Sequence, residues 1–284
     1  MKKINVPALV ILIGLLIISG CGDKSADIEK MRIEGRQALD AGDFNKAINI
    51  FKEALKYSPS DRDFLFDLAM SFRKFELYDS AYTYFRRAKV LNIHDREINK
   101  QIIEMAPMFG DFEDAINAIA VMVATGDNEK MYWPRLAELY YRNQDMFMTA
   151  KYCKLILADD PELKDYYLYL SGALSQMGKF EESSKTLLDA MDRFGPSSEA
   201  CANIAVNYLA VKNLEKAEEY FRKSLEVNPE NIPIWINLAN VLSEQDNRTK
   251  KEEGLEIYKK FYEQTPPAYK LDSLIPALEA ELSN

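Results

Sequence analysis

The sequence predicts an all-α protein, a solenoid of seven tandem helix–turn–helix repeats followed by a capping helix. Three sets of residues predict this fold, because each set recurs every 34 residues along the 284-residue chain. Two of the sets have small side chains and the third is bulky. Self-similarity at a fixed period of this length is typical of repeat proteins, in which each helix pair buries its apolar face against the next pair.

The first small set lies on the first helix expected in each repeat, with Ile103 as a bulky exception: Gly35, Ala69, Ile103, Ala137, Ser171, Ala205 and Ala239. The second small set lies on the second helix, and its last member is displaced by three residues: Ala47, Ala81, Ala115, Thr149, Ser183, Ala217 and Gly254. The bulky set carries the same shift at its end: Phe51, Phe85, Ile119, Cys153, Leu187, Phe221 and Tyr258. We expect small residues where two helix backbones approach closely, and the bulky residue in the space beside them.

Glycine and proline mark the expected helix ends. Glycine lies in the turn between the two helices of a repeat, where we expect it to end the first helix with a positive φ, at Gly42, Gly110 and Gly178. Proline, which cannot continue a helix, follows the second helix at Pro59, Pro161, Pro229 and Pro266.

This pattern resembles the tetratricopeptide repeat, a 34-residue helix pair with small residues, an aromatic residue and a proline at fixed positions. Repeats two, six and seven resemble it most, through Leu68-Ala69 with Phe72, Ile204-Ala205 with Tyr208, and Trp235 with Leu238-Ala239. The resemblance covers residues 28–266 and implies a right-handed α-α superhelix. Its repeats are 28–61, 62–95, 96–129, 130–163, 164–197, 198–231 and 232–268.

Three places depart from the pattern. Pro107 falls late in the first helix of repeat three and Pro134 near the start of repeat four, so the sequence does not define the helix boundaries there. The two prolines mark either a bend or divergence of the repeat. Repeat seven is three residues too long, and we expect the excess to enlarge its internal turn, over residues 244–253. Residues 269–284 do not align as an eighth repeat, and we expect them to form a capping helix. Its apolar residues Ile275, Leu278 and Leu282 would cover the exposed face of repeat seven.

The N-terminus has the pattern of an export signal. Lys2 and Lys3 precede an almost wholly apolar stretch, residues 6–18, and small residues lead into Cys21. This order is typical of a secretory signal peptide. The tetrapeptide 18–21 resembles the lipobox of bacterial lipoproteins, which implies that residues 1–20 are removed and that Cys21 is lipidated. An uncleaved transmembrane anchor is the alternative, although the apolar stretch is short for a bilayer span.

The lipobox resemblance also implies a location. The protein would be exported and lipid-anchored to a bacterial membrane facing the periplasm, with residues 21–27 as the lipidated N-terminus and a short linker. Several acyl chains on one residue hold a protein on a membrane without a spanning helix. Gly22 follows the cysteine where an aspartate would favour the inner membrane, so the outer membrane is favoured if the source is Gram-negative.

The composition and motifs argue against two classes of function. The formal net charge is −9 and no basic run occurs, whereas nucleic-acid binding needs clustered Lys and Arg. No metal-binding, nucleophile or phosphate-loop motif is present, and His94 is the one histidine, so we expect no catalytic residue, metal or cofactor. Cys153 and Cys201 fall on inward-facing positions of non-adjacent repeats, and we interpret both as free packing residues.

By resemblance to the family, the first helices line a concave groove that binds a partner. At those positions the chain has residue types enriched at interface hot spots, together with amides that can bond a peptide backbone. The predicted site is Arg32, Arg36, Phe66, Met70, Arg73, Arg135, Tyr141, Arg142, Tyr169, Asn203, Asn237 and Asn240. The alternative is that Phe66 and Met70 simply pack on neighbouring helices, and that Glu97, Glu104 and Glu138 neutralise the arginines.

Together these features predict a non-enzymatic, membrane-anchored scaffold that binds a protein or peptide partner during assembly of a cell-envelope complex. Two alternatives remain open. The first is a module that binds envelope glycan or peptidoglycan, with Tyr141, Tyr169 and Trp235 as stacking platforms. The second is a structural spacer that oligomerises with itself. No three consecutive repeats supply the carboxylate clamp of chaperone-binding repeats, so we do not expect that ligand.

Overall fold

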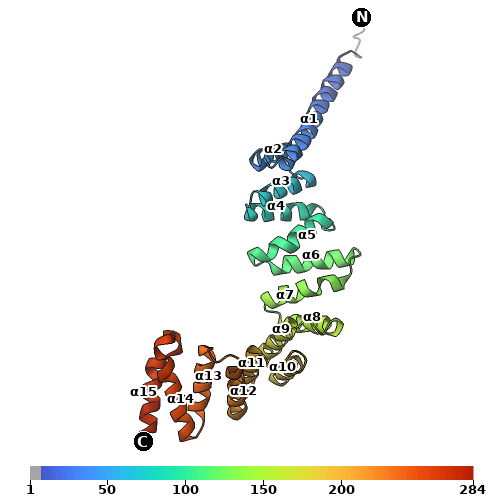
Figure 1. Cartoon of the computed structure of the whole chain (residues 1–284). Coiled ribbons are helices and arrows are strands. Elements are labelled where there is room, and N and C mark those ends of the chain that lie inside the picture. Colours follow the sequence, from blue (N-terminus) through green and yellow to red (C-terminus); the bar gives the residue numbers. More distant parts are fainter. Residues whose placement is uncertain (1–7, 284) are drawn as a thin grey trace, which may run out of the picture. The chain divides into compact units, whose positions relative to one another are not determined.

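The computed structural model describes residues 8–283, with side chains from Lys24 onward, and its regular elements are all helical (Figure 1). The chain divides into two compact units, Met1–Glu129 and Lys130–Asn284. The predicted all-α fold of consecutive packed helix pairs is confirmed across the described residues, because each helix packs against the next one within its unit.

The helices of the first unit are α1 (Ala8–Asp40), α2 (Phe44–Tyr57), α3 (Arg62–Lys74), α4 (Tyr78–Leu91), α5 (Arg96–Met105), the 3-10 helix η1 (Ala106–Phe109) and α6 (Phe112–Ala124). The 3-10 helix η2 (Glu129–Tyr132) spans the boundary. The second unit contains α7 (Trp133–Arg142), α8 (Met146–Asp159), α9 (Asp165–Gln176), α10 (Phe180–Phe194), α11 (Ser198–Ala210), α12 (Leu214–Val227), α13 (Ile232–Glu244), α14 (Arg248–Phe261), η3 (Tyr262–Gln264), η4 (Pro267–Tyr269) and α15 (Leu271–Leu282).

Short polar side chains begin most of these helices. The Asp61 carboxylate accepts hydrogen bonds from the backbone N–H groups of Asp63 and Phe64 at the start of α3. A side chain at the N-cap satisfies backbone donors that the first turn leaves without a helical partner. The same role belongs to Asp43, Asp95, Asp111, Asp145, Ser197, Asn213, Asn231 and Asn247.

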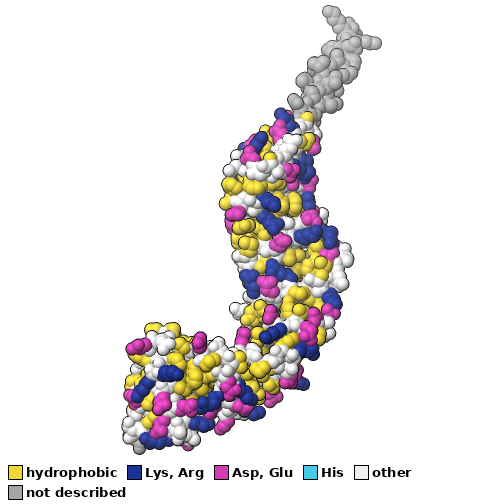
Figure 2. All heavy atoms as spheres, viewed as in Figure 1, with side chains coloured by type: hydrophobic (Ala, Val, Ile, Leu, Met, Phe, Trp, Pro, Cys, Tyr) yellow, Lys and Arg dark blue, Asp and Glu magenta, His cyan; other side chains and the backbone are white. Residues whose placement is uncertain are grey.

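The three periodic sets form the core, as predicted. Every member of the second small set and of the bulky set is buried, and only Ile103 in the first set is half-buried. The bulky residues Phe51, Phe85 and Phe221 have no exposed surface. Charged side chains of both signs cover the face drawn in Figure 2, with apolar side chains between them. The 34-residue period therefore records which side chains fill the space between helix pairs.

A left-handed residue ends the first helix in six successive repeats. Gly42, Gly110 and Gly178 have φ values of 78°, 76° and 74°, which confirms the prediction. The same position in the alternate repeats has no glycine, yet φ is positive there too, at Glu76, Gln144 and Lys212. The hydrogen bonds explain this: in the first turn the Asp43 N–H bonds to the Ala38 carbonyl at 2.9 Å, and each of the six turns repeats that bond. This Schellman arrangement requires a left-handed residue whatever its side chain.

Replacing Lys212 with glycine should therefore stabilise the protein. A residue with a Cβ pays about 1 kcal/mol or more to occupy the left-handed region. Part of that gain is offset by the greater freedom of glycine in the unfolded chain, so we expect about 0.5–1 kcal/mol in the free energy of unfolding. Urea denaturation followed by circular dichroism measures the difference. The converse change, Gly178→Ala, should destabilise the protein, and a loss of stability in Lys212→Gly would contradict the explanation.

The N-terminal helix is longer than expected. The predicted linker, residues 21–27, lies inside α1, which is continuous from Ala8 to Asp40. No proline occurs between these ends, so nothing interrupts the backbone hydrogen bonds of the helix. Residues 1–7 and the Cys21 side chain, on which the signal-peptide and lipidation predictions partly rest, lie outside what the structure describes. Among the helices searched in the described part, none is long and apolar enough to cross a membrane.

The structure defines the helix boundaries at the two middle prolines, which the sequence left open. Pro107 ends α5 after ten residues, and the chain continues as the 3-10 helix η1. Pro134 lies in the first turn of α7, where its missing N–H costs no hydrogen bond. The irregular centre of the sequence is therefore made of shortened helices with 3-10 extensions.

The expected enlarged turn in repeat seven is wrong. The turn between α13 and α14 contains only Gln245, Asp246 and Asn247, as short as the other turns. The three extra residues instead form an additional turn of helix at the start of α14, and Gly254 and Tyr258 still reach their buried positions. A helical turn satisfies its own backbone groups, whereas a longer loop would leave them to solvent.

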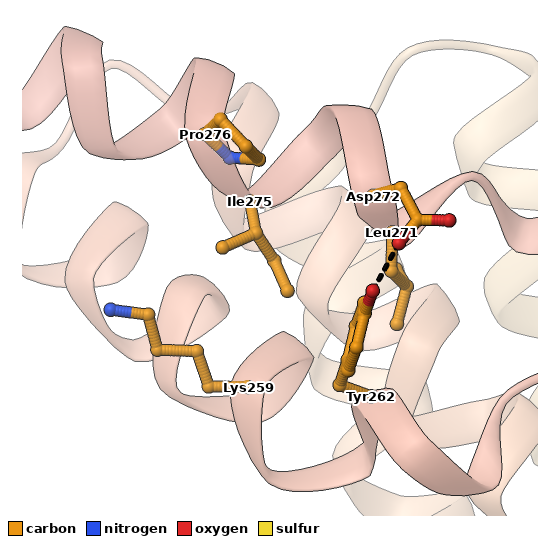
Figure 3. A pocket seen from close by; sticks show the side chains of 6 residues that line it. All are labelled: Lys259, Tyr262, Leu271, Asp272, Ile275 and Pro276. Carbon is orange, nitrogen blue, oxygen red and sulfur yellow. Dashed lines mark hydrogen bonds between the residues drawn. The ribbon is translucent and has the colours of Figure 1, made fainter.

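The predicted capping helix is α15, which packs on α14. Leu278 is buried against the core of repeats six and seven, and Ile275 and Leu282 pack on that core while partly exposed. Figure 3 shows a pocket between α14 and α15, where the Tyr262 hydroxyl points at the Asp272 carboxylate and donates a hydrogen bond to it. The polar groups beside this pocket are thus engaged within the chain.

Candidate functional site

Helix α7 presents two different faces. Leu136 and Leu139 are buried in the second unit, and Tyr140 stacks on Tyr152 of α8 with ring centroids 5.7 Å apart. The opposite face carries the polar and aromatic residues Arg135, Glu138, Tyr141 and Arg142, which the helical period places together. Pro134 positions this face, because its ring fixes the backbone at the first turn of α7.

Helix α9 lies beside that face and adds two tyrosines to it. Tyr169 is 45% exposed and Tyr141 is 37% exposed, and their rings meet edge to face with centroids 5.5 Å apart. Tyr166 contacts Tyr169 from the preceding helical turn, at 6.1 Å between ring centroids. Leu170 and Leu174, on the other side of α9, are buried in the core and hold the helix in place.

A pocket of about 400 Å³ opens between these two helices. We call it the α7–α9 groove, and it is lined by Pro134, Arg135, Ala137, Glu138, Tyr166 and Tyr169. Its walls combine flat aromatic surface with one ion pair, and concave sites of this composition are typical binding sites. Tyr141 extends the aromatic surface through its contact with Tyr169.

Two arginines and one carboxylate lie together on the α7 side of the groove. Glu138 Oε2 lies 2.7 Å from Arg135 Nη1, and its other oxygen lies 3.6 Å from Arg142 Nη1. Glu138 therefore lies between the two arginines on this face of α7. Burial, followed by nearby polar groups that include Cys153 and Tyr169, raises the pKa of the Tyr166 hydroxyl, so Tyr166 stays protonated at neutral pH and can donate a hydrogen bond.

The arginines predicted in the first unit are engaged within the chain. Arg32 lies 2.9 Å from the Asp61 carboxylate, with its guanidinium over the Phe64 ring. Arg36 Nε bonds to Asp67 at 2.7 Å. Arg73 bonds to Glu104 at 2.6 Å. These arginines form ion pairs between the first helices of successive repeats. The contacts favour the alternative that each arginine is neutralised within the chain and holds neighbouring repeats together.

The remaining predicted residues are spread over several helices. Phe66 packs edge to face on Phe85 at 5.6 Å, and Met70 is half-buried on the same helix. Asn203 is exposed on α11 and Asn237 is half-buried on α13, whereas the Asn240 side chain accepts a hydrogen bond from the Tyr258 hydroxyl. The structure thus brings together Arg135, Tyr141, Arg142 and Tyr169, whereas the other predicted residues lie on other helices.

Sequence reasoning missed Tyr166 and Pro134 as lining residues. Tyr166 lies outside the repeat positions that line the groove in the family. Pro134 lies at one of those positions, but it was interpreted only as a residue that affects a helix boundary. The available signal was compositional: residues 141–169 contain five tyrosines, and three of them lie in α9. A cluster of tyrosines close to Pro134 is a reason to consider residues beyond the family's groove positions as lining residues.

The predicted packing role of the two cysteines is confirmed. Cys153 and Cys201 are buried free thiols. Burial raises the pKa of the Cys153 thiol to about 12, and it also raises the pKa of Cys201, so neither is a thiolate at neutral pH. No group of three or more His, Cys, Asp and Glu side chains suited to a metal ion occurs in the described part of the chain.

Comparison with known proteins identifies the repeated unit. Residues 34–95 and 198–231 each match the tetratricopeptide-repeat family. The chain contains tetratricopeptide repeats. A curated relative with sequence similarity is Superkiller protein 3 of Schizosaccharomyces pombe, 31% identical over 104 residues. That similarity covers 37% of this chain and 8% of the relative, so the chain spans a small part of that protein's length.

Solved structures share the repeat architecture. A chain of the Naa15/Naa10 complex bound to HypK-THB superposes with a TM-score of 0.65 and 16% identity, over 89% of this chain and 39% of the other. YrrB, described as a tetratricopeptide-repeat protein with an unusual peptide-binding site, gives a TM-score of 0.48 and 14% identity over 65% of this chain and 95% of its own. At such identities the similarity to the Naa15/Naa10 complex concerns the fold, which is that of a tetratricopeptide-repeat scaffold.

Proposed function

We propose that this chain is a membrane-anchored adaptor that binds a protein partner through the α7–α9 groove during assembly of a cell-envelope complex. The observation that carries the proposal is the groove itself, where Arg135, Tyr166 and Tyr169 line one concave surface on two first helices. Tetratricopeptide repeats bind protein or peptide partners, and Tyr and Arg are enriched among the residues that dominate binding energy at interfaces.

The geometry of the aromatic residues supports a protein partner over a glycan. A sugar ring stacks on a flat aromatic face, whereas Tyr141 and Tyr169 meet at an interplanar angle of 76°. Trp235, the third residue considered for stacking, lies against Phe261 on another helix pair, and its indole N–H donates to the Pro229 carbonyl at 2.8 Å. An edge-to-face pair beside a partly neutralised arginine suits a mixed apolar and polar peptide surface.

Replacing Arg135, Tyr141 and Tyr169 together with alanine should abolish capture of the partner. Each residue is of the kind that contributes about 2 kcal/mol or more when it is an interface hot spot, so the combined loss exceeds two orders of magnitude in affinity. The measurement is chemical crosslinking in the native envelope, followed by purification of the chain and quantitative mass spectrometry of the proteins that crosslink to it.

The matched control is Phe147→Ala with Lys151→Ala, two exposed residues of α8, the second helix of the same repeat. The control variant should retain the partner, and circular dichroism should show that both variants keep their helix content. If the triple variant still captured the partner, the proposal that the partner binds through the α7–α9 groove would be wrong. Binding to purified cell-wall material by the parent, lost in the triple variant, would assign the groove to a glycan.

We further propose that Cys21 carries the lipid that anchors this adaptor, on the strength of the signal-peptide pattern and the tetrapeptide before the cysteine. Cys21→Ser should move the protein from the membrane fraction to the soluble fraction, because a single residue carries all the acyl chains. Fractionation with immunoblotting measures this, and Cys153→Ser is the matched control, since that buried thiol is unavailable for modification. A Cys21→Ser protein that stayed on membranes would contradict lipidation and favour the uncleaved anchor.

A further inference from the structure

The first unit exposes a row of apolar side chains at the turns between its first and second helices. Phe75 is 41% exposed, Leu77 46% and Tyr78 40%, all around the turn between α3 and α4. Met108 is 59% exposed and Phe109 41%, in η1 one repeat later. We call these five residues the turn strip. Single exposed apolar residues are ordinary, but five within two consecutive turns form a patch of the kind that marks an interaction surface.

Aromatic contacts extend the strip at both of its ends toward neighbouring repeats. The Phe44 ring, at the start of α2, lies 6.5 Å from the Phe75 ring between centroids. Phe109 stacks on Tyr82 of α4 with centroids 5.1 Å apart and an interplanar angle of 3°. A pocket beside this stack is lined by Asp79, Tyr82, Thr83, Arg86, Phe109 and Asp111. The turns of the first three repeats are therefore joined by aromatic contacts, with a pocket at the point where the second meets the third.

The charges that border the strip are mainly carboxylates without partners. Glu76, Asp79 and Glu113 are exposed and take part in no ion pair with the described residues. This is unusual for this unit, where other carboxylates such as Asp61 and Asp67 bond to arginine. Arg86 lies 3.7 Å from Asp111 and 3.9 Å from Asp114, so it is occupied there. Lys74, next to Phe75 in the chain, offsets one of the three unpaired charges at most.

We propose that the turn strip binds a segment of a partner protein whose apolar face is bordered by Lys and Arg. The apolar side chains of the strip would contact that face, and the unpaired carboxylates would attract its cations. The sign of the charge selects this occupant: anionic lipid headgroups would be repelled by Glu76, Asp79 and Glu113. The α7–α9 groove lies in the second unit and contains arginines paired with a glutamate, so the strip is a second and chemically distinct surface.

The test measures binding of a fluorescein-labelled amphipathic peptide of Leu and Lys, about 14 residues long so that a helix spans roughly 20 Å. Fluorescence anisotropy is recorded with the full chain in a nonionic detergent. A Leu/Glu peptide with the same apolar pattern reports binding that depends on apolar contact alone. Two variants change the strip: Leu77→Gln with Met108→Gln removes apolar surface, and Asp79→Lys with Glu113→Lys reverses charge.

Matched controls come from exposed residues of the second unit. Phe147→Gln with Val211→Gln removes similar apolar surface, and Glu215→Lys with Asp246→Lys makes the same change in net charge. We expect the parent and both controls to bind the Leu/Lys peptide at least about tenfold more tightly than either strip variant does, a change of roughly 1.4 kcal/mol. Added salt should weaken binding by the parent and the controls.

Three outcomes would overturn the proposal. Equal binding of the Leu/Lys and Leu/Glu peptides would show that the carboxylates select nothing. Equal losses in strip and control variants would show that the net charge of the chain, and not the strip, attracts the peptide. Self-association of the parent in light scattering that is lost in the strip variants, without peptide binding, would assign the strip to a second copy of this chain. The Arg135, Tyr141 and Tyr169 variant should bind the peptide normally, which separates this test from that of the groove.

Discussion

Phe221→Ala is expected to lower the free energy of unfolding by about 3–5 kcal/mol, because it empties a fully buried position and leaves a cavity. Phe221 lies at the centre of the core of repeats six and seven, together with Ala205, Ala217 and Ala239. These alanines belong to helices whose backbones lie close together, so the surrounding structure has little freedom to collapse into the space. Urea denaturation of the variant, followed by circular dichroism at 222 nm, measures the loss.

The equivalent position in repeat four provides the comparison. Cys153 is also fully buried, and Cys153→Ala removes only one sulfur atom. We expect a loss of about 1 kcal/mol, in line with the small apolar volume removed. If both variants lost the same stability, the size of the side chain at this repeat position would not determine the packing. Neighbouring repeats of a solenoid can unfold in part, so the urea dependence of each variant should be compared with that of the parent.

Gly35→Ala is expected to destabilise the protein by about 1–3 kcal/mol, although alanine is the better helix former. A Cβ placed on Gly35 would lie 2.5 Å from a ring carbon of Phe51, well inside van der Waals contact. Phe51 is fully buried, so its ring cannot move aside without disturbing its neighbours. Thermal unfolding measured by circular dichroism should show a lower midpoint for the variant.

A matched glycine and a second substitution make this prediction specific. Gly172 lies inside α9, and a Cβ there would meet nothing within 4 Å, so Gly172→Ala should stabilise the protein by up to about 1 kcal/mol. In the double variant Gly35→Ala with Phe51→Leu, the smaller side chain makes room for the methyl group. Its loss should therefore be less than the sum of the two single losses. Strict additivity would contradict the steric explanation.

Much of the fold was predictable because the same packing problem recurs in every repeat. A position between two close helix backbones admits only a small side chain, and seven occurrences of that requirement make it visible without an alignment. The periodic sets therefore predicted the buried positions of Ala47, Phe51 and their equivalents. The pattern was uninformative where geometry is set by the backbone: Glu76, Gln144 and Lys212 adopt a glycine-like φ because the turn's hydrogen bonds require it.

The candidate site was predictable only in part. The family's groove positions supplied Arg135, Tyr141 and Tyr169, but they gave equal weight to Arg32 and Arg36. Sequence alone could not show that Arg36 is held by Asp67, which lies 31 residues away on the next first helix. The turn strip was not predicted at all, since an apolar residue in a turn can be either buried or exposed, and only the surrounding helices decide which.

By itself, the sequence determined the helical repeat, its period and the side chains that fill its core, because these follow from local periodicity and from sizes repeated along the chain. Tertiary structure decided how irregular segments are accommodated, as when three surplus residues became a turn of α14 and not a longer loop. It also decided which polar side chains remain available to a partner. Availability depends on distances between residues far apart in the chain, and a one-dimensional pattern does not contain those distances.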